Sequence, residues 1–568
     1  MTQTPRTARR SPPPRAWWVP LLLLAACLSS QDEPDKTSSP TETITETDVD
    51  TDSDTDTTDP LDTGPTGTSS TTDAFRSALY PDAWTPSLTD VEGRFLHDFS
   101  YAGYHSGEQA LPNIAGPLYD VTAYGAVADD VTDNTLSIQA AIDDAELAGG
   151  VVFFPAGTFR IDGTLSVEAS NVVLRGEGAL TQLHFTKTSG MSDTAHLTLR
   201  GSRTTGYEAL ATADLVQREF TVAVADASGF TVGDQVEIGW TITPEFVADH
   251  GMTGVWGPFN DSWVTFWRRT IVDIDTNAVP HQVTLDAPHR YPALVRDGVS
   301  MVAVTGQLTE VGIEDLAVTN AADVASAEAN DRNHIIDLVE VRDGWVARVE
   351  TFHHLGEANG HVQSGGLRIL QSRRVTVLDS SFENAQNRLG GGNGYLVEVS
   401  QVTDVLIESV LAVNGRHNLI QNWGFGATGI VWKDCYSSGS TAFNEPLTWI
   451  GVPAYSEFHH SLATANLIEG GIWHDGFKAE DRGLYSSGAG SSATESVFWN
   501  VGGNGLISTD QHGWGYVIGA SDTLTVRTDP LLGPIDGPPE DWVETVPAGQ
   551  VLSPTSLYED QLSRRLAP

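Results

Sequence analysis

The chain is poor in bases, and above all in lysine. Among its 568 residues there are 31 Lys and Arg against 75 Asp and Glu, which gives a formal net charge of −44. Lysine occurs four times, at Lys36, Lys187, Lys433 and Lys478. Nucleic acids are bound through clustered basic side chains that displace their counterions. We therefore expect no nucleic-acid partner.

Cysteine and long apolar runs are equally scarce. Cys27 and Cys435 lie far apart, and the segment around Cys27 explains its presence without a disulfide. The apolar run Ala16–Ala26 has eleven residues, whereas a membrane-spanning helix needs about 20. Basic residues precede this run, and Leu24-Ala25-Ala26-Cys27 ends it. The pattern resembles a bacterial lipoprotein signal peptide over 1–27 with Cys27 lipidated, and the alternative is an ordinary signal peptide with a chance cysteine.

The segment that follows, 28–75, is rich in acids and in Thr, Ser and Pro. Between Asp32 and Asp62 there are twelve acids and one Lys. Such a composition cannot bury enough apolar surface to offset the entropy of ordering, so it predicts a disordered, extended tether. Residues 1–27 carry +4 and residues 28–62 carry −11, so residues 63–568 carry −37 of the total. We expect a secreted bacterial lipoprotein, held at the outer membrane or cell surface by its N-terminal lipid.

A compact pattern lies between Tyr119 and Phe185. A turn at Tyr124-Gly125-Ala126 and an acidic loop with Asp130 precede a helical run that starts at Asp133, which suits an N-cap, and ends at Gly149-Gly150. An apolar strand and the turn Pro155-Ala156-Gly157 follow. This order of residues resembles the N-terminal motif of the pectate lyase superfamily, which includes rhamnogalacturonases and polygalacturonases. The resemblance implies a right-handed parallel β-helix whose first coil is capped by the short helix.

The rest of the chain predicts a solenoid from its own periodicity. Apolar runs that begin at Trp345, Arg374, Asp404 and Gly429 are separated by 29, 30 and 25 residues, a spacing typical of repeat architectures. Asn384 and Asn414 each stand ten residues after the start of a run, which predicts an asparagine ladder at one corner.

These patterns divide the chain into segments. Residues 76–116 form an N-terminal extension, and 117–525 form an all-β parallel β-helix domain. A small antiparallel β insertion interrupts it at about 207–292, where the apolar runs no longer follow the repeat spacing of the β-helix. The tail, 526–568, is rich in Pro and Gly, and we expect it to pack along the exterior of the β-helix.

The family resemblance implies that a sugar chain lies in a groove along one parallel sheet and that catalytic groups project from neighbouring coils. The pair Arg416 and His417 could neutralise a sugar carboxylate and move a proton near neutral pH, or could form a solvated turn. In Glu457-Phe458-His459-His460, adjacent strand residues point to opposite faces, so at most one histidine faces the groove, and His460 is the candidate. This pair and His353-His354 lack the spacing of a metal site and favour hydrogen-bonded turns over zinc.

A third cluster holds Asp475, Lys478 and Arg482. Lys478 or Arg482 could act as the base that removes a proton beside a sugar carboxylate if desolvation lowers its pKa. Asp475 with a second carboxylate would instead make the acid–base pair of a glycosidase. The third interpretation is a solvated charged turn. Neither the polygalacturonase catalytic residues nor the Asp-rich calcium site of pectate lyases is recognisable as a linear motif.

Tryptophans in loop-like segments are candidate platforms for pyranose rings, and core packing is the alternative. They are Trp256, Trp263, Trp267 and Trp423. No cofactor and no metal site is evident from the residues, and calcium enters only through the family resemblance.

We therefore expect a monomeric, cell-surface, carbohydrate-active enzyme that cleaves a polysaccharide. Pectate-lyase-like β-elimination is favoured. A glycoside hydrolase on the same fold, or a non-catalytic glycan-binding or adhesin β-helix, are the alternatives. The acidity of the body favours a neutral glycan unless its few bases form a local positive strip.

Overall fold

A computed structural model describes residues 73–354, 359–443, 451–529 and 541–567. The predicted signal peptide, its Cys27 and the tether up to residue 72 lie outside the described residues. Within the described ranges, no helix is long and apolar enough to cross a bilayer.

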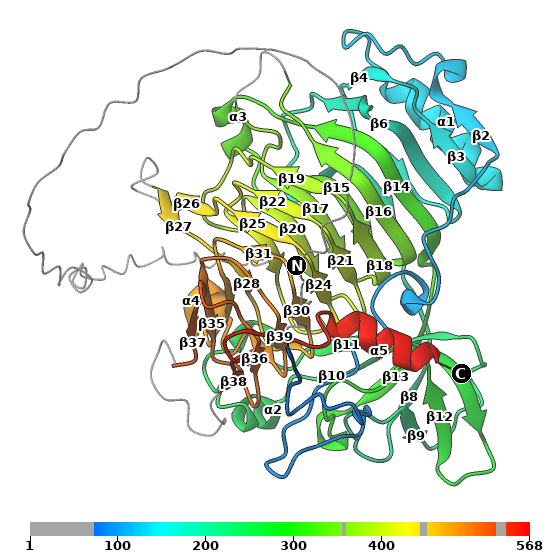
Figure 1. The fold of residues 1–568 in the computed structure, drawn as a ribbon. Helices are drawn as coiled ribbons and strands as arrows, with labels where there is room; N and C mark the ends of the chain where they lie inside the picture. The colour runs from blue at the N-terminus through cyan, green and yellow to red at the C-terminus, as the bar shows by residue number, and fades with distance from the viewer. Residues whose placement is uncertain (1–72, 355–358, 444–450, 530–540, 568) are drawn as a thin grey trace, which may run out of the picture. The chain divides into compact units, whose positions relative to one another are not determined.

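The described chain winds into a parallel β-helix whose successive coils stack their strands in three rows (Figure 1). The first row is a ten-stranded parallel sheet, in the order β5 (Leu165–Val167), β7 (Ala195–Arg200), β15 (His334–Val339), β17 (Gly365–Leu370), β20 (Tyr395–Ser400), β23 (His417–Gln421), β28 (Ser456–Phe458), β32 (Phe477–Ala479), β35 (Leu506–Thr509) and β37 (Thr525–Arg527). The all-β parallel β-helix predicted from the sequence is therefore confirmed.

The other two rows share their longest strands. The second row runs β2 (Leu118–Asp120), β3 (Gly150–Phe153), β6 (Val172–Phe185), β14 (Leu308–Thr319), β16 (Val341–Thr351), β18 (Arg373–Leu378), β21 (Leu406–Glu408), β24 (Val431–Lys433), β30 (Leu467–Glu469), β34 (Val497–Trp499), β36 (Tyr516–Ile518) and β38 (Trp542–Glu544). The third runs β4 (Gly157–Ile161), β6, β14, β16, β19 (Ser381–Glu383), β22 (Leu411–Val413), β25 (Tyr436–Ser438) and β31 (Ile472–Trp473).

Stacked apolar side chains fill the interior of the β-helix. One column takes a fully buried residue from each successive coil of the second row: Val346, Val377, Ile407, Trp432, Ile468 and Phe498. Because strands of neighbouring coils pair in parallel, apolar side chains at the same position of successive coils stack on one another. Each coil therefore covers the apolar interior of the coil before it. The register corrects one predicted step, because Trp345 pairs with Thr376, 31 residues on, rather than with Arg374.

The predicted asparagine ladder is present at a corner. Nδ2 of Asn414 donates to Oδ1 of Asn384 at 2.8 Å, and both residues have a left-handed backbone, with φ of 61° and 56°. Asparagine tolerates this conformation better than most residues, so each can make the sharp turn between strands and bond its neighbour.

A short helix, α1 (Thr135–Ala148), covers the first coil and buries Ile138, Ala141 and Ile142 against it. Asn134 occupies the N-cap position. The predicted cap, Asp133, lies one residue earlier and accepts a hydrogen bond from the Thr135 amide at 3.0 Å.

The insertion is a six-stranded antiparallel sheet, in the order β8 (Thr204–Leu210), β13 (Ser300–Thr305), β10 (Gln235–Thr241), β11 (Trp263–Asp275), β12 (His281–Leu285) and β9 (Thr221–Val224). It is joined to the β-helix by a buried charge network. Asp404, fully buried in the coils, bonds Nη1 of Arg269 at 3.1 Å and Nη2 of Arg290 at 3.3 Å, and both arginines are fully buried. These ion pairs hold the insertion against the coils.

The remaining elements are short. They are β1 (Asp73–Phe75), which pairs with β39 (Gln550–Leu552), β26 (Thr441–Phe443) with β27 (Gly451–Pro453), β29 (Ala463–Thr464) with β33 (Ala493–Thr494), helices α2 (Pro244–Asp249), α3 (Val324–Glu328), α4 (Tyr485–Gly488) and α5 (Leu557–Leu566), and 3₁₀ turns η1 (Tyr104–Gly107), η2 (Val121–Tyr124), η3 (Gly257–Phe259) and η4 (Val295–Asp297). Apolar residues of the N-terminal extension, Tyr80 among them, pack with Leu557 and Tyr558 of α5 on the outside of the second row.

Candidate functional site

A cavity of about 690 Å³ lies along the ten-stranded sheet. Strands β17 and β20 supply Arg368, Tyr395 and Glu398 to its lining, and the loops after β23 and β28 supply Trp423 and the His459–His460 pair. Arg332, Arg416 and two serines of α4 also line the cavity. The cavity therefore combines cationic, imidazole and phenol groups over one sheet.

The strand register explains how this chemistry is assembled. Asp337, Arg368, Glu398, Ile420, Glu457 and Lys478 occupy one position in six successive strands of the sheet. Neighbouring strands in a sheet lie about 4.8 Å apart, so charged side chains on adjacent coils are within ion-pair reach. Residues up to 141 positions apart in the sequence thus form a single row.

Glu457 and His459 form a buried hydrogen-bonded pair beside the cavity. Nδ1 of His459 donates to Oε1 of Glu457, and Nη1 of Arg482 donates to the other carboxylate oxygen at 2.7 Å. Burial alone would raise the pKa of Glu457, but the neighbouring His417, the charge of Arg482 and the hydrogen bond from His459 hold it well below its usual range. Because Nδ1 is the donor, Nε2 of the neutral ring is left as a proton acceptor.

Their buried surroundings keep the imidazoles of His459 and His460 neutral. Burial lowers the pKa of His459, and it lowers that of His460 to about 3. The His459 ring lies 6.2 Å from the ring of Tyr395, centroid to centroid. Burial also raises the pKa of the Tyr395 phenol, so at neutral pH this side chain is a proton donor. A neutral base and a neutral acid therefore lie close together.

Arg416 differs from the other cations of the cavity. Arg332 is paired with Asp193 through two bonds, and Arg368 with Asp337 at 2.6 Å. Among the described residues, no carboxylate lies within ion-pair distance of Arg416, and its Nε is buried without a hydrogen-bond partner. Arg416 is therefore free to bind an anion brought by a ligand.

Three residues named from the sequence line the cavity: Arg416, His460 and Trp423. The Trp423 side chain is 49% exposed, and its ring lies 4.6 Å from that of His460. It can therefore offer a ring face to a sugar. The rule that only one of His459 and His460 can face the groove is wrong here, because β28 ends at Phe458 and both histidines lie in the loop after it.

The other candidates from the sequence lie around the cavity rather than in its lining. His417 is buried, with Nδ1 bonded to the Tyr455 carbonyl at 2.7 Å and Nε2 3.6 Å from Glu457. Arg482 supports Glu457. The Nζ of Lys478 lies 4.2 Å from the ring centre of Tyr455 and 3.5 Å from Glu480.

Asp475 has a structural role at a corner. One of its carboxylate oxygens accepts hydrogen bonds from Asn418, Ser437 and the Ser440 amide at 3.0 to 3.2 Å. It joins two coils and does not reach the cavity lining. The carboxylate that the glycosidase interpretation would place in the groove is therefore occupied elsewhere.

Burial separates the candidate tryptophans. Trp256 and Trp267 are 0% and 1% exposed, in the core of the insertion, so they present no ring face to a ligand and the stacking interpretation is not supported for them. Trp256 instead donates to the Ala489 carbonyl at 2.9 Å. Trp263 is half-buried and donates to Ser300 at 2.9 Å.

Tyr395 and Glu398 could not be named from the sequence, and the sequence predicts that His460 rather than His459 faces the groove. The spacing Glu457-x-His459 would place both side chains on one side of a strand, but β28 ends at Phe458, so His459 reaches Glu457 from the loop that follows. Tyr395 carried no such signal, because its neighbours come from other coils.

The carboxylates around the cavity do not fit the calcium ion that the family resemblance implies. Ca²⁺ takes six to eight oxygen ligands. Asp193 is bonded to Arg332, Glu398 to His334 and Asn422, and Glu457 to His459 and Arg482. A calcium ion here would have to compete with those bonds for every one of the carboxylates.

Comparisons with known proteins bear on the first part of the chain. A family model described as "Rhamnogalacturonase A/epimerase, pectate lyase-like" matches residues 118–244. Mannuronan C5-epimerase AlgE5 of Azotobacter vinelandii is 46% identical over 68 residues, 11% of this chain and 7% of that protein. Alginate lyase 7 of the same organism is 44% identical over 68 residues, 11% of this chain and 8% of that protein. The match thus spans less than a tenth of the length of either relative.

Solved structures resemble the described chain only distantly. The tailspike gp61 of Pseudomonas phage phi297 is 13% identical, with a TM-score of 0.44 over 76% of each chain. An exopolygalacturonase of Thermotoga maritima is 12% identical, with a TM-score of 0.29 over 72% of each chain. The parallel β-helix is therefore established by the strand pairings of this chain, and the similarity to the pectate-lyase-like family model extends over residues 118–244.

Proposed function

We propose that the protein cleaves an acidic polysaccharide by β-elimination in the cavity of the ten-stranded sheet. The observation that carries this proposal is the Glu457–His459 pair, which places a neutral imidazole beside Arg416, a cation with no carboxylate partner among the described residues. Removal of a proton beside a sugar carboxylate needs a base and a cation that stabilises the resulting anion. Both are present in this lining.

The reaction can be written with these groups. Arg416 binds the C6 carboxylate of a uronate, and Nε2 of His459 takes the proton from C5. The electron pair left at C5 forms the C4–C5 double bond as the C4–O bond breaks. The Tyr395 hydroxyl gives its proton to the departing oxygen, and the second turnover begins when the proton on His459 returns to Tyr395 through solvent. Glu457 holds the imidazole and stabilises its charged form.

A glycoside hydrolase is less well supported at this site. It needs one carboxyl group that is protonated near neutral pH and one that is ionised. Burial would raise the pKa of Glu398, but its bond to His334 and the charge of Arg368 lower it to about 2. Glu457 is also ionised. Neither Glu398 nor Glu457 can therefore serve as the protonated acid that a hydrolase would require.

The relatives favour chemistry at C5. One is named a mannuronan C5-epimerase and another an alginate lyase. Epimerisation at C5 begins with the same loss of the C5 proton and ends with its return on the other face. C5 epimerisation of a polyuronate is therefore the second candidate, and it would use His459 and Arg416 in the same way.

A glycan panel in D₂O tests the proposal. The purified chain is incubated with polyuronates and with neutral polysaccharides of similar length. Ultraviolet absorbance from an unsaturated uronate supports the lyase, and deuterium at C5 without that absorbance supports the epimerase. New reducing ends with neither signal indicate a hydrolase, and retention on a glycan column without any product indicates a binding protein. Either of the last two results overturns the proposal.

We also propose that Cys27 carries a lipid that anchors the protein at the bacterial cell surface. The basic start, the short apolar run and Leu24-Ala25-Ala26-Cys27 support this. A Cys27→Ser variant should move from the membrane fraction to the soluble fraction, and unchanged fractionation would refute the anchor.

A further inference from the structure

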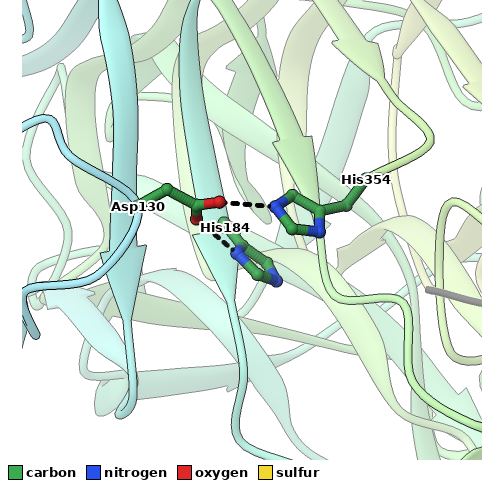
Figure 2. A group of neighbouring side chains, drawn as sticks. All are labelled: Asp130, His184 and His354. Atoms are coloured by element: carbon green, nitrogen blue, oxygen red, sulfur yellow. Dashed lines mark hydrogen bonds and ion pairs between the residues drawn. The ribbon is translucent and has the colours of Figure 1, made fainter. Parts of the chain in front are cut away.

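A second cluster of ionisable side chains lies outside the cavity lining, where a loop before α1, strand β6 and the segment after β16 meet (Figure 2). Oδ1 of Asp130 is 2.8 Å from Nδ1 of His184, and Oδ2 is 2.7 Å from Nε2 of His354. The two imidazole rings are stacked, with centroids 3.9 Å apart. One ligand atom from each residue lies within 4.8 Å of the other two.

The three residues come from distant parts of the chain. Asp130 follows the 3₁₀ turn η2, and its amide bonds the Thr158 carbonyl of β4 at 3.0 Å. His184 lies near the end of β6, and His354 lies three residues after β16. The backbone of Asp130 is left-handed, with φ of 57°. The segment between η2 and α1, which holds Asp130, and two coils of the β-helix therefore bring these three side chains together.

Within the described ranges, two other groups of histidine and carboxylate come equally close, but an arginine is bonded to the carboxylate in each of them. In the group of His417, Glu457 and His459, Arg482 bonds Glu457 at 2.7 Å. In the group of His105, Glu310 and Asp343, Arg374 bonds Asp343 at 2.6 Å.

Asp130 makes no ion pair with Lys or Arg among the described residues; its ion-pair partners there are His184 and His354. A cation entering this cluster would therefore meet no competing guanidinium on the carboxylate, unlike in the other two.

We propose that Asp130, His184 and His354 bind a divalent transition-metal ion of the Zn²⁺ class, which ties the turn before α1 to two coils of the β-helix. Two imidazole nitrogens and one carboxylate oxygen are ligands that Zn²⁺ prefers, at about 2.0–2.2 Å each. The Asp130 side chain is 33% exposed and that of His354 is 17% exposed, so water can complete the coordination. Calcium, which prefers oxygen ligands, is excluded by the two imidazoles.

Zinc binding by the intact chain tests this site. The purified protein is stripped with a chelator and titrated with ZnCl₂ by isothermal calorimetry, and the retained zinc is measured by mass spectrometry after gel filtration. We expect one zinc ion per chain in the wild type. His354→Ala should weaken its affinity roughly a hundredfold or more, because the site loses one of three protein ligands. His353→Ala is the matched control, since His353 is the exposed neighbour outside the cluster.

A second measurement separates the stability that zinc contributes from the stability that the Asp130 hydrogen bonds contribute. For each variant, the melting temperature in chelator is subtracted from that in zinc, so that any loss of the Asp130 hydrogen bonds cancels. The wild type and His353→Ala should show the same positive difference. Asp130→Asn and His354→Ala should show a smaller one or none. Zinc binding by His354→Ala equal to that of the wild type, or no zinc retained by the wild type, overturns the proposal.

Discussion

Glu457 accepts a hydrogen bond from Nδ1 of His459, two residues further along the chain. The same carboxylate is bonded to Arg482 on its other oxygen at 2.7 Å, so the imidazole is held by a group that is itself fixed. A histidine held in this way has a defined tautomer and a defined direction. This relationship underlies the first two predictions.

Replacing His459 should abolish most turnover. We expect His459→Gln to lower kcat about 10²- to 10⁴-fold, the usual contribution of a general base. His474→Gln is the control, because His474 bonds Asn504 at 2.6 Å and does not line the cavity. Steady-state rates on the polyuronate found active in the panel measure the effect. A His459→Gln enzyme as active as the control would refute the assignment of the base.

The pH dependence should follow the neutral form of His459. Burial lowers its pKa below the ordinary 6.5, so the base stays neutral and active down to a lower pH. The acid limb of kcat/KM should therefore fall below pH 6.5. Burial raises the pKa of Tyr395, so its proton is kept well beyond pH 8.

A substitution at Glu457 gives this profile a second test. The Glu457 charge raises the pKa of His459 and opposes the effect of burial. Glu457→Gln should therefore move the acid limb to still lower pH and also reduce kcat. A limb that does not move would show that Glu457 has no electrostatic influence on the base.

Arg416 should determine the preference for acidic glycans. A hydrogen bond to a charged group contributes about 1.5–3 kcal/mol, so Arg416→Ala should lower kcat/KM on a polyuronate about 10- to 100-fold. Arg416→Lys should recover part of the loss. Arg348→Ala is the matched control, since Arg348 is 45% exposed and pairs with Asp315 on another face. Equal losses in both alanine variants would remove Arg416 from the site.

Asp404 should matter for stability more than any surface carboxylate. Asp404→Ala would leave Arg269 and Arg290 buried without their counter-charge. Breaking such a buried pair costs about 3–5 kcal/mol. Asp315→Ala, which breaks a surface pair with Arg348, should cost about 1 kcal/mol or less. Denaturant melts of both variants compare them, and similar midpoints would contradict the role of the network.

Much of the fold could be predicted from the sequence, because its signals are local or repeat at a fixed distance. The helix α1, its glycine stop and the asparagine ladder all follow from neighbouring residues and one spacing. The predicted register failed by two residues at Trp345. An alternating pattern looks the same when it is shifted by two, so only the interlocking of the coils selects one pairing.

The candidate site was predictable only in part. Arg416, His460 and Trp423 could be named as types of residue suited to a sugar. Their neighbours could not, because Tyr395 and Glu398 lie on β20 while His459 follows β28, two strands away in the sheet. The same holds for Asp130 and His354, which are 224 residues apart in the sequence and 2.7 Å apart at their polar atoms.

The structure shows which of the few basic side chains are paired with carboxylates. The sequence by itself determined the acidic composition, the parallel β-helix and the residue types available for chemistry. The tertiary structure decided which bases are already neutralised, because strand register brings Arg332 to Asp193 and Arg368 to Asp337. It also leaves Arg416 without such a partner among the described residues. Pairing depends on distances of a few ångströms between coils, and no spacing along the chain encodes them.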